Sequence, residues 1–260
     1  MKDFQKITLP FENNLFDELL HSADFEITGK GRLGNHLVDV KDKGVPIVRT
    51  TTIYNIPANQ FSALHQSIIV SLNAEIEKNN IDDLPKVDFN NALIEVYDSS
   101  YATMKYHSDQ ALDLEEGSYI GLFSCYQNPE ELSEKNLRKL KVKDKTTDEE
   151  FDIILNHNSV VLFPLSANTA FLHKIILESV PKQKTPESNK WLGITFRKSK
   201  TFIQFEDNKP RFSSGELLEL ADEDQKTEFY KLRGLENFTM DFTYPEISYT
   251  LSISDTMLPK

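Results

Sequence analysis

Two histidines and one aspartate are the residues whose types and spacing best suit chemistry. His107 and Asp109 are separated by one residue, and side chains at i and i+2 of an extended segment project to the same side, so both can reach one metal ion. His173 follows Asp109 by 64 residues, inside the apolar run 169–177. Two imidazoles and one carboxylate form the facial triad of non-haem iron sites, which leaves coordination positions open for other ligands. These three residues therefore predict an Fe(II) site.

One arginine is placed to serve the same site. Arg197 follows His173 by 24 residues, at the end of the apolar run 191–197, WLGITFR. A guanidinium in that place offers paired, charge-assisted hydrogen bonds to a carboxylate. We therefore expect a dicarboxylate bound beside the metal to depend on Arg197.

The elements that must position these residues are mainly short strands. From residue 92 onward, β-rich runs alternate with polar turns. The runs are 92–97, 118–126, 137–143, 151–155, 159–164, 170–177 and 191–199, and the polar residues 143–150 form the turn of a hairpin between two of them. Seven or more short strands in about 110 residues favour a barrel or a double-sheet jelly roll.

Helices are expected before these strands. Residues 15–20 follow Asn13 and Asn14, either of which could cap a short helix. A longer helix is expected after Pro57, because apolar residues recur there at helical spacing. These residues are Phe61, Leu64, Ile68 and Leu72.

The tail after residue 205 has signals of its own. Ser213 and Glu216 match the Ser-x-x-Glu capping box, which predicts a helix from there to about Gly234. Residues 247–253 alternate between apolar and polar, which is typical of a last strand. Because residues 206–260 are few for a core of their own, we expect them to pack on the main domain.

Two other features of the sequence are not interpreted as functional sites. The run 29–34, GKGRLG, matches the dinucleotide-binding fingerprint literally, but no β-α-β unit surrounds it, so a flexible and locally basic loop is expected. The remaining histidines have no partner at ligand spacing and are expected on the surface. They are His21, His36, His65 and His157.

The charge balance limits the classes of partner. With 29 Lys and Arg against 41 Asp and Glu, the net charge is −12, which argues against an extended nucleic-acid surface. A local patch of positive charge, such as Lys30, Arg32 and Arg49, could still bind nucleic acid despite the negative net charge. The one cysteine, Cys125, excludes an internal disulfide and a thiolate metal cluster. No apolar run reaches the length of a membrane span and no signal peptide is expected, so the sequence predicts a cytoplasmic protein with no membrane partner.

The run 92–200 resembles the 2-oxoglutarate/Fe(II) dioxygenases, and most closely their AlkB-like branch. The matching pieces are ALIEVYDSSYATMKYHSDQ, NSVVLFPLSANTAFLHKI and KWLGITFRKSK. The resemblance implies that the iron ligands are His107, Asp109 and His173. It also implies that 2-oxoglutarate is bound by Tyr97, Thr195 and Arg197, of which Arg197 matches the second co-substrate arginine of the family. Because Arg197 is the only arginine in the last core strand, we expect the distal carboxylate of 2-oxoglutarate to depend on it.

Three places depart from the family pattern. Glu95 stands where AlkB-like enzymes usually carry asparagine, and Trp191 stands where they usually carry an arginine. Residues 110–112 are Gln-Ala-Leu, where acidic residues often lie near the target base. The family's N-terminal loops form a lid over the active site, which makes Lys30 and Arg32 candidate substrate contacts.

The resemblance also implies a fold and a domain organisation. The expected class is α+β and mainly β, with a double-stranded β-helix (jelly roll) core, supporting N-terminal helices and a C-terminal helix and strand extension. We expect a dioxygenase domain over residues 1–205, in which 1–90 hold the helices and the lid and 91–205 form the jelly roll. Residues 206–260 are then the packed extension.

The implied activity is an oxidation that uses Fe(II) with 2-oxoglutarate and O2 as co-substrates. 2-Oxoglutarate would be decarboxylated to succinate and CO2 while a C–H bond is hydroxylated, and a hydroxylated N-methyl group would be lost as formaldehyde. Three functions stay open: an AlkB-like dealkylase or hydroxylase of nucleic acid, an oxygenase of a protein side chain or small molecule, and a non-enzymatic jelly-roll binding module. The sequence leaves the substrate and the oligomeric state open.

Overall fold

A large antiparallel sheet forms the centre of the molecule. The computed structural model describes residues 3–79, 81, 84–134, 136–178 and 189–260. In spatial order the sheet contains β1 (Gln5–Thr8), β10 (Ser159–Pro164), β7 (Tyr119–Tyr126), β12 (Trp191–Arg197), β6 (Asn91–Tyr97), β3 (Arg32–Val38) and β2 (Glu26–Gly29), with the short β5 (Asn59–Gln60) parallel to β3. The strands predicted at 92–97, 118–126, 159–164 and 191–199 are confirmed within two residues.

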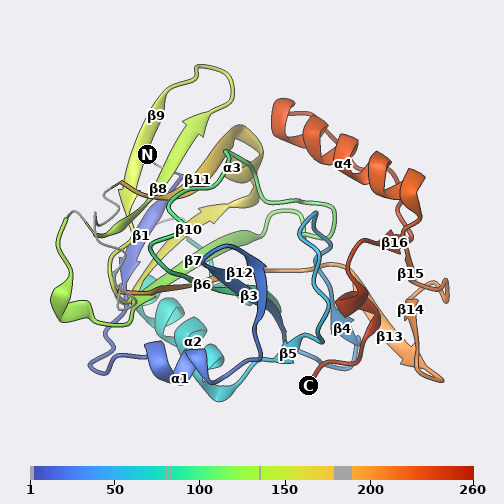
Figure 1. Cartoon of the computed structure of the whole chain (residues 1–260), viewed down its shortest axis with the longest axis horizontal. Helices are drawn as coiled ribbons and strands as arrows, with labels where there is room; N and C mark the ends of the chain where they lie inside the picture. Colours follow the sequence, from blue (N-terminus) through green and yellow to red (C-terminus); the bar gives the residue numbers. More distant parts are fainter. Residues whose placement is uncertain (1–2, 80, 82–83, 135, 179–188) are drawn as a thin grey trace.

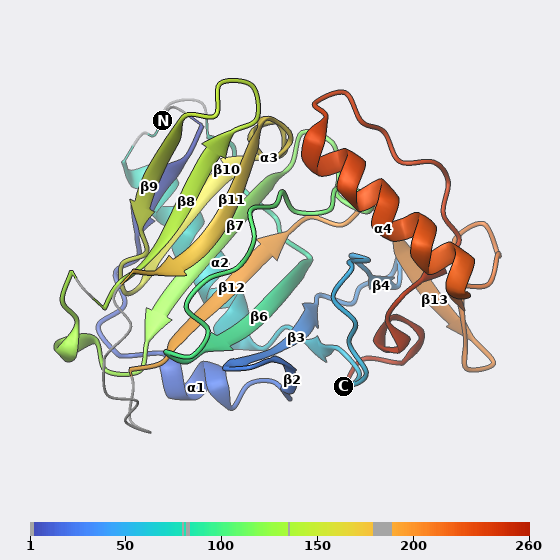
Figure 2. The same cartoon turned by 45° about the horizontal axis from the view of Figure 1, so that its top comes forward.

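A smaller sheet faces the large one. It consists of β11 (Phe171–Leu177), β8 (Arg138–Asp144) and β9 (Glu150–Ile154), and the β8–β9 hairpin turns where the polar residues 143–150 predicted it. Apolar side chains of both sheets, such as Leu122 and Leu140, form one buried cluster between them. The two layers are visible in Figure 2, and they confirm the predicted jelly roll.

Two helices cover the other face of the large sheet, as predicted (Figure 1). They are α1 (Phe16–Leu20) and α2 (Ala63–Lys78), whose buried residues share a cluster with β6, β7 and β12. Asn14 accepts a hydrogen bond from the Phe16 N–H at 3.0 Å, and Ser62 caps α2 together with His65. His65 and His36 are both buried, so the expectation that they lie on the surface is wrong. His65 caps a helix and His36 packs on Tyr54, which places both rings inside the fold.

The glycine-rich run forms a β-hairpin, so the expectation of a flexible loop is wrong. Gly29 ends β2 and Arg32 begins β3, and the turn between them includes Gly31 at φ +72°. A Cβ on Gly31 would overlap with the side chains of Asp98 and Ser100. The spacing of these glycines therefore reflects a tight turn pressed against a neighbouring segment.

The tail differs from its prediction in where the helix begins. Helix α4 spans Glu223–Phe238, and Asp222 is its N-cap and accepts from the Gln225 N–H at 2.8 Å. The expected cap at Ser213 instead lies in a turn, where Gly215 has φ +87° and donates its N–H to Phe212 O. A left-handed residue at this point is incompatible with the first turn of a helix.

The remaining elements are short. β13 (Phe202–Glu206), β14 (Lys209–Phe212) and β4 (Val45–Pro46) form a third sheet, and β15 (Glu219–Leu220) pairs in parallel with β16 (Tyr249–Thr250). The predicted last strand is thus two residues long and is followed by the 3-10 turn η2 (Ile253–Thr256), while α3 (Leu165–Ala170) and η1 (Pro129–Glu131) lie within the jelly roll. Among the residues that the structure describes, no helix is long and apolar enough to cross a membrane.

Candidate active site

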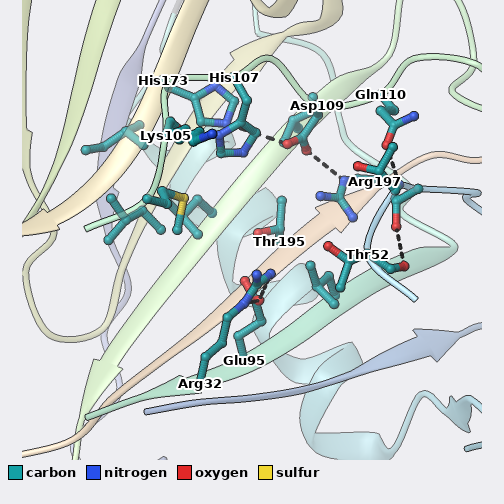
Figure 3. A pocket seen from close by; sticks show the side chains of 18 of the residues that line it. Arg32, Thr52, Glu95, Lys105, His107, Asp109, Gln110, His173, Thr195 and Arg197 are labelled. Carbon is teal, nitrogen blue, oxygen red and sulfur yellow. Dashed lines mark hydrogen bonds and ion pairs between the residues drawn. The ribbon is translucent and has the colours of Figure 1, made fainter. Parts of the chain in front are cut away.

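A cavity of about 260 Å³ lies between the two sheets and contains most of the residues singled out from the sequence. Strands β3, β6, β7, β10 and β12 of the large sheet and β8 and β11 of the small sheet contribute to its wall, together with residues of the loops 50–52 and 101–110. Arg233 of α4 lines it as well. Figure 3 shows the polar side chains that point into this space.

His107, Asp109 and His173 lie together at one side of the cavity. One possible ligand atom from each lies within 4.8 Å of the other two. The segment that carries His107 runs antiparallel to β11, and the backbone N–H groups of His107 and His173 each donate to the carbonyl oxygen of the other residue, at 3.0 and 2.7 Å. This bridge places the two imidazoles side by side, with ring centroids 4.7 Å apart.

The His107 ring is in the form that a metal requires. Its Nδ1 lies 3.0 Å from the carbonyl oxygen of Lys105 and can donate to it, which leaves Nε2 free as a ligand. Burial, reinforced by the nearby His173 and Arg233, lowers the pKa of His107 to about 3. The imidazole is therefore neutral at physiological pH, as metal binding needs.

Asp109 is held as a carboxylate by Arg197. Both side chains are buried, and Arg197 Nε donates to Asp109 Oδ2 at 2.8 Å. Burial alone would raise the pKa of Asp109, but Arg197 and His173 outweigh it, so this pKa lies well below its usual range. The second oxygen, Oδ1, lies 3.5 Å from His173 Nε2, on the side where the three ligand atoms converge.

Arg197 keeps one donor free for an anion. Its Nη1 is buried and has no hydrogen-bond partner among the described residues. An unpaired buried guanidinium N–H is costly, and a bound carboxylate would remove that cost. The donor set and this orphaned atom together fit a divalent metal with a carboxylate co-substrate beside it.

The other residues implied in co-substrate binding line the same cavity. Thr195 lies two residues from Arg197 on β12, and Tyr97 lies on the neighbouring strand β6. The Tyr97 hydroxyl donates to Glu95 Oε2 at 2.7 Å, and Glu95 Oε1 accepts from Arg32 Nε at 2.6 Å. Glu95, which departs from the family pattern, is thus paired with a guanidinium from the β2–β3 hairpin.

Trp191, the second departure, is packed among other side chains at the start of β12. It is 1% exposed, its ring lies 4.8 Å from that of Tyr97, and it covers Gly193, where any Cβ would overlap with it. Arg138 stacks on both rings and donates to the carbonyl oxygens of Tyr101 and Asp98. The arginine usual at position 191 is therefore replaced by packed aromatic rings.

Residues outside the sequence motif hold in place the loop that carries His107 and Asp109. Asn168 of α3 accepts from the Asp109 N–H at 2.7 Å and donates to the Asp109 carbonyl at 2.8 Å. From α4, Asn237 accepts from the Ser108 N–H at 3.0 Å, and Glu236 accepts from the Ala111 N–H at 2.7 Å. The contacts from α4 have no sequence signal, because more than 120 residues separate each pair of partners.

The local basic patch considered for nucleic acid does not form. Arg49 is 4% exposed, its Nη2 lies 2.7 Å from Asp113 Oδ1, and its Nη1 donates to Ile247 O. Arg32 is paired with Glu95 inside the cavity, and Lys30 alone of the three is exposed. The expectation for Arg49 is wrong because the guanidinium ties the jelly roll to the tail instead of facing solvent.

A family model described as the 2OG-Fe(II) oxygenase superfamily matches residues 32–197, which is more than half of the chain and includes the triad, Tyr97 and Arg197. The chain belongs to this superfamily. It is accordingly a 2-oxoglutarate-dependent dioxygenase, with Fe(II) as its metal and 2-oxoglutarate and O2 as its co-substrates.

One solved structure shares the fold of this oxygenase. The structure of OsALKBH1 has a TM-score of 0.50 at 12% identity and covers 75% of this chain and 98% of its own. A Pseudomonas putida prolyl-4-hydroxylase has a TM-score of 0.42 at 14% identity and covers 75% of this chain and 92% of its own. The comparison with curated proteins finds no match.

Proposed function

We propose that His107, Asp109 and His173 bind the Fe(II) of this oxygenase, and that Arg197 meets the co-substrate beside them. The observation that carries this proposal is that three possible ligand atoms lie within 4.8 Å of one another on the wall of the cavity. The buried Arg197 lines the same cavity, and its Nη1 has no hydrogen-bond partner among the described residues. Bound Fe(II) would supply the activation of O2 at the expense of 2-oxoglutarate. The remaining chemistry of the site belongs to the side chains around it.

Arg197 has two roles in this proposal. It keeps Asp109 ionised and oriented through the hydrogen bond from Nε, and it offers Nη1 to a carboxylate of 2-oxoglutarate. The apolar part of the cavity wall lowers the local dielectric constant, which strengthens these charge-assisted hydrogen bonds. That wall includes Leu122, Leu140, Phe163 and Ile175.

We further propose that the reaction is AlkB-like oxidative hydroxylation, and demethylation where the target is an N-methyl group. The motif resemblance makes alkylated nucleic acid the first substrate class. The charge distribution favours the second class, a protein side chain or a small molecule. On β8, Lys139, Lys141 and Lys143 all form ion pairs with carboxylates, and the buried Arg49 pairs with Asp113.

Succinate formation tests the class, and formaldehyde release tests the substrate. The protein loaded with Fe(II) should convert 2-oxoglutarate to succinate, and Asp109→Ala should abolish the conversion. Formaldehyde is then measured with N-methylated oligonucleotides, N-methylated peptides and free N-methyl amines. Release from oligonucleotides alone would establish the first class, and release from peptides or amines alone would establish the second. Succinate formation no greater than that of Asp109→Ala would contradict the role of Asp109 as a metal ligand.

A further inference from the structure

The Arg32–Glu95 ion pair lies on the cavity wall beyond Thr195, as seen from the candidate metal ligands. Alternate residues of β12 face the cavity, and their register with β6 places Arg197 opposite Asn91, Thr195 opposite Leu93, and Gly193 opposite Glu95. Figure 3 shows Arg32 and Glu95 on the side of Thr195 away from Asp109 and Arg197. A chain-like ligand that begins at the metal and passes Thr195 therefore reaches Arg32.

2-Oxoglutarate is a ligand of this kind, because its two carboxylates lie at opposite ends of a five-carbon chain. The 2-oxo acid end would be held at the proposed metal site, where Arg197 is already engaged with Asp109. The distal carboxylate then needs a second cation farther along the cavity. Four cationic side chains line the described cavity wall: Arg32, Lys105, Arg197 and Arg233.

Two of these four cations are poorly placed for the distal carboxylate. Arg233 comes from α4, and its Nη1 donates at 2.9 Å to Asn237 Oδ1, which also accepts from the N–H of Ser108, the residue between His107 and Asp109. Arg233 therefore lies near the metal end of the cavity. Lys105 is exposed, two residues from His107. Arg32, in contrast, is largely buried, with 18% of its side chain exposed.

Among the described residues, the start of β12 contributes no cation to the cavity wall. Trp191 occupies that position, and Arg138, which stacks on its ring, donates to two backbone carbonyl groups. Within Arg32, Glu95 engages Nε and Nη2, so the third nitrogen, Nη1, takes no part in this ion pair. A guanidinium can serve a protein carboxylate on one edge and a ligand carboxylate on another, because its five N–H donors are fixed in a plane.

We propose that Arg32, from the β2–β3 hairpin, holds the distal carboxylate of 2-oxoglutarate, and that Glu95 orients the guanidinium for it. This inference rests on the proposed function. It assigns a co-substrate contact to an N-terminal hairpin instead of β12. It also explains together the two departures from the family pattern, Glu95 and Trp191. Because Trp191 stands at the start of β12, no arginine is present there. Glu95 then supplies the carboxylate that orients Arg32 in its place.

A pair of 2-oxo acids tests the assignment by equilibrium binding. 2-Oxopentanoate has the same five-carbon chain as 2-oxoglutarate with a methyl group in place of the distal carboxylate. The ratio of their dissociation constants, measured by calorimetry on the Mn(II)-loaded full chain, reports the distal contact alone. We expect the wild type to prefer 2-oxoglutarate, and we expect the Arg32→Leu variant to lose about 30-fold or more of that preference. Arg32→Lys should lose part of it, because an ammonium keeps the charge without the planar fork.

The double variant Arg32→Leu/Glu95→Gln removes an ambiguity. In Arg32→Leu alone, an unpaired Glu95 would repel any nearby carboxylate, whether or not Arg32 touches it. With Glu95 neutralised, the preference should stay low if Arg32 contacts the ligand. A return to the wild-type preference would overturn the inference.

Two matched variants separate Arg32 from the other cations. Arg197→Leu should weaken both 2-oxo acids alike and keep their ratio, because Arg197 acts at the end that they share. Lys105→Met should leave the ratio unchanged. A ratio that collapses in Arg197→Leu and not in Arg32→Leu would assign the distal carboxylate to Arg197 and overturn the inference. Failure of the Mn(II)-loaded wild type to bind either acid would overturn the proposed function itself.

Discussion

Single residues in this site act in pairs that combine charge with orientation. Arg197 donates to the carboxylate that we assign to the metal, so one guanidinium couples that ligand to the co-substrate position. Arg32 and Glu95 form the second pair, with Tyr97 completing the hydrogen bonds of the carboxylate. In each pair a guanidinium compensates the negative charge of a buried carboxylate. This interaction offsets the free-energy cost of removing the carboxylate from water.

The metal assignment predicts a thermal shift that depends on the triad. Mn(II), which is inert toward O2 chemistry here, should raise the melting temperature of the wild type, because a ligand that binds only the folded state stabilises it by mass action. His107→Ala and Asp109→Ala should abolish this shift, and chelation should reverse it in the wild type. The matched control is His21→Ala, which removes an exposed histidine and should keep the full shift. Full shifts in both triad variants would contradict the assignment.

The buried His65 predicts an acid-sensitive contribution to stability. Burial lowers its pKa from 6.5 to about 4, so between these pH values the unfolded chain binds a proton that the folded chain does not. The free energy of unfolding therefore falls as the pH falls through this range, by about 3 kcal/mol when complete. His65→Gln keeps a capping side chain that does not titrate, so its urea unfolding curves should depend less on pH between 6.5 and 4. An unchanged pH dependence would show that His65 does not carry this effect.

At the scale of elements, helices from two distant parts of the chain position the loop that carries His107 and Asp109. α3 holds the backbone of Asp109 through Asn168, while α4 holds the flanking residues Ser108 and Ala111. The loop itself has few regular backbone hydrogen bonds. These side-chain contacts therefore decide where the candidate ligands point.

Asn168 offers the sharpest test of this support. Asn168→Ala would leave the buried N–H and C=O groups of Asp109 without partners, at a cost of about 1–3 kcal/mol in the free energy of unfolding. Metal affinity should fall about 10- to 100-fold, as for other residues that orient a ligand. Thr169→Ala is the control, because the Thr169 hydroxyl bonds only within α3, to Leu165 O. Metal titration of the two variants should separate them, and equal affinities would contradict the role of Asn168.

The whole molecule carries a net charge of −12, and much of its cationic charge is already paired. The lysines of β8 face carboxylates, and Arg49 and Arg32 are engaged in ion pairs with Asp113 and Glu95. At physiological salt, charges beyond about 8 Å are largely screened, so local unpaired cations decide whether a polyanion binds.

This charge distribution predicts weak binding of duplex DNA with a shallow salt dependence. Each phosphate contact contributes about −0.9 to the slope of log K against log salt, so a few contacts give a slope no steeper than about −3. Titrations of labelled duplexes and single strands between about 50 and 200 mM salt measure it. Tight duplex binding with a much steeper slope would contradict this prediction. It would mean that the described cations leave their ion pairs to contact phosphates.

Local patterns were enough to predict the strands of the jelly roll and the residues of the triad. The strand runs are short and alternate with polar turns, and His107 and Asp109 are neighbours in sequence, so their placement on one side follows from backbone geometry. His173 and Arg197 were assigned to the same site from their residue types and their places in later apolar runs, the resemblance supported both, and the structure places both beside Asp109.

Only the tertiary structure decided which residues complete the site. Arg32 reaches Glu95 across 63 positions, Asn237 reaches Ser108 across 129, and the buried positions of His36 and His65 depend on elements that pack over them. Helix α4 is capped by Asp222 and not by Ser213 as predicted, because Gly215, which has a left-handed conformation, turns the chain between them. A local pattern specifies which way a side chain points along its own element. Which partner it meets depends on how distant elements pack, and no periodicity in the sequence records that.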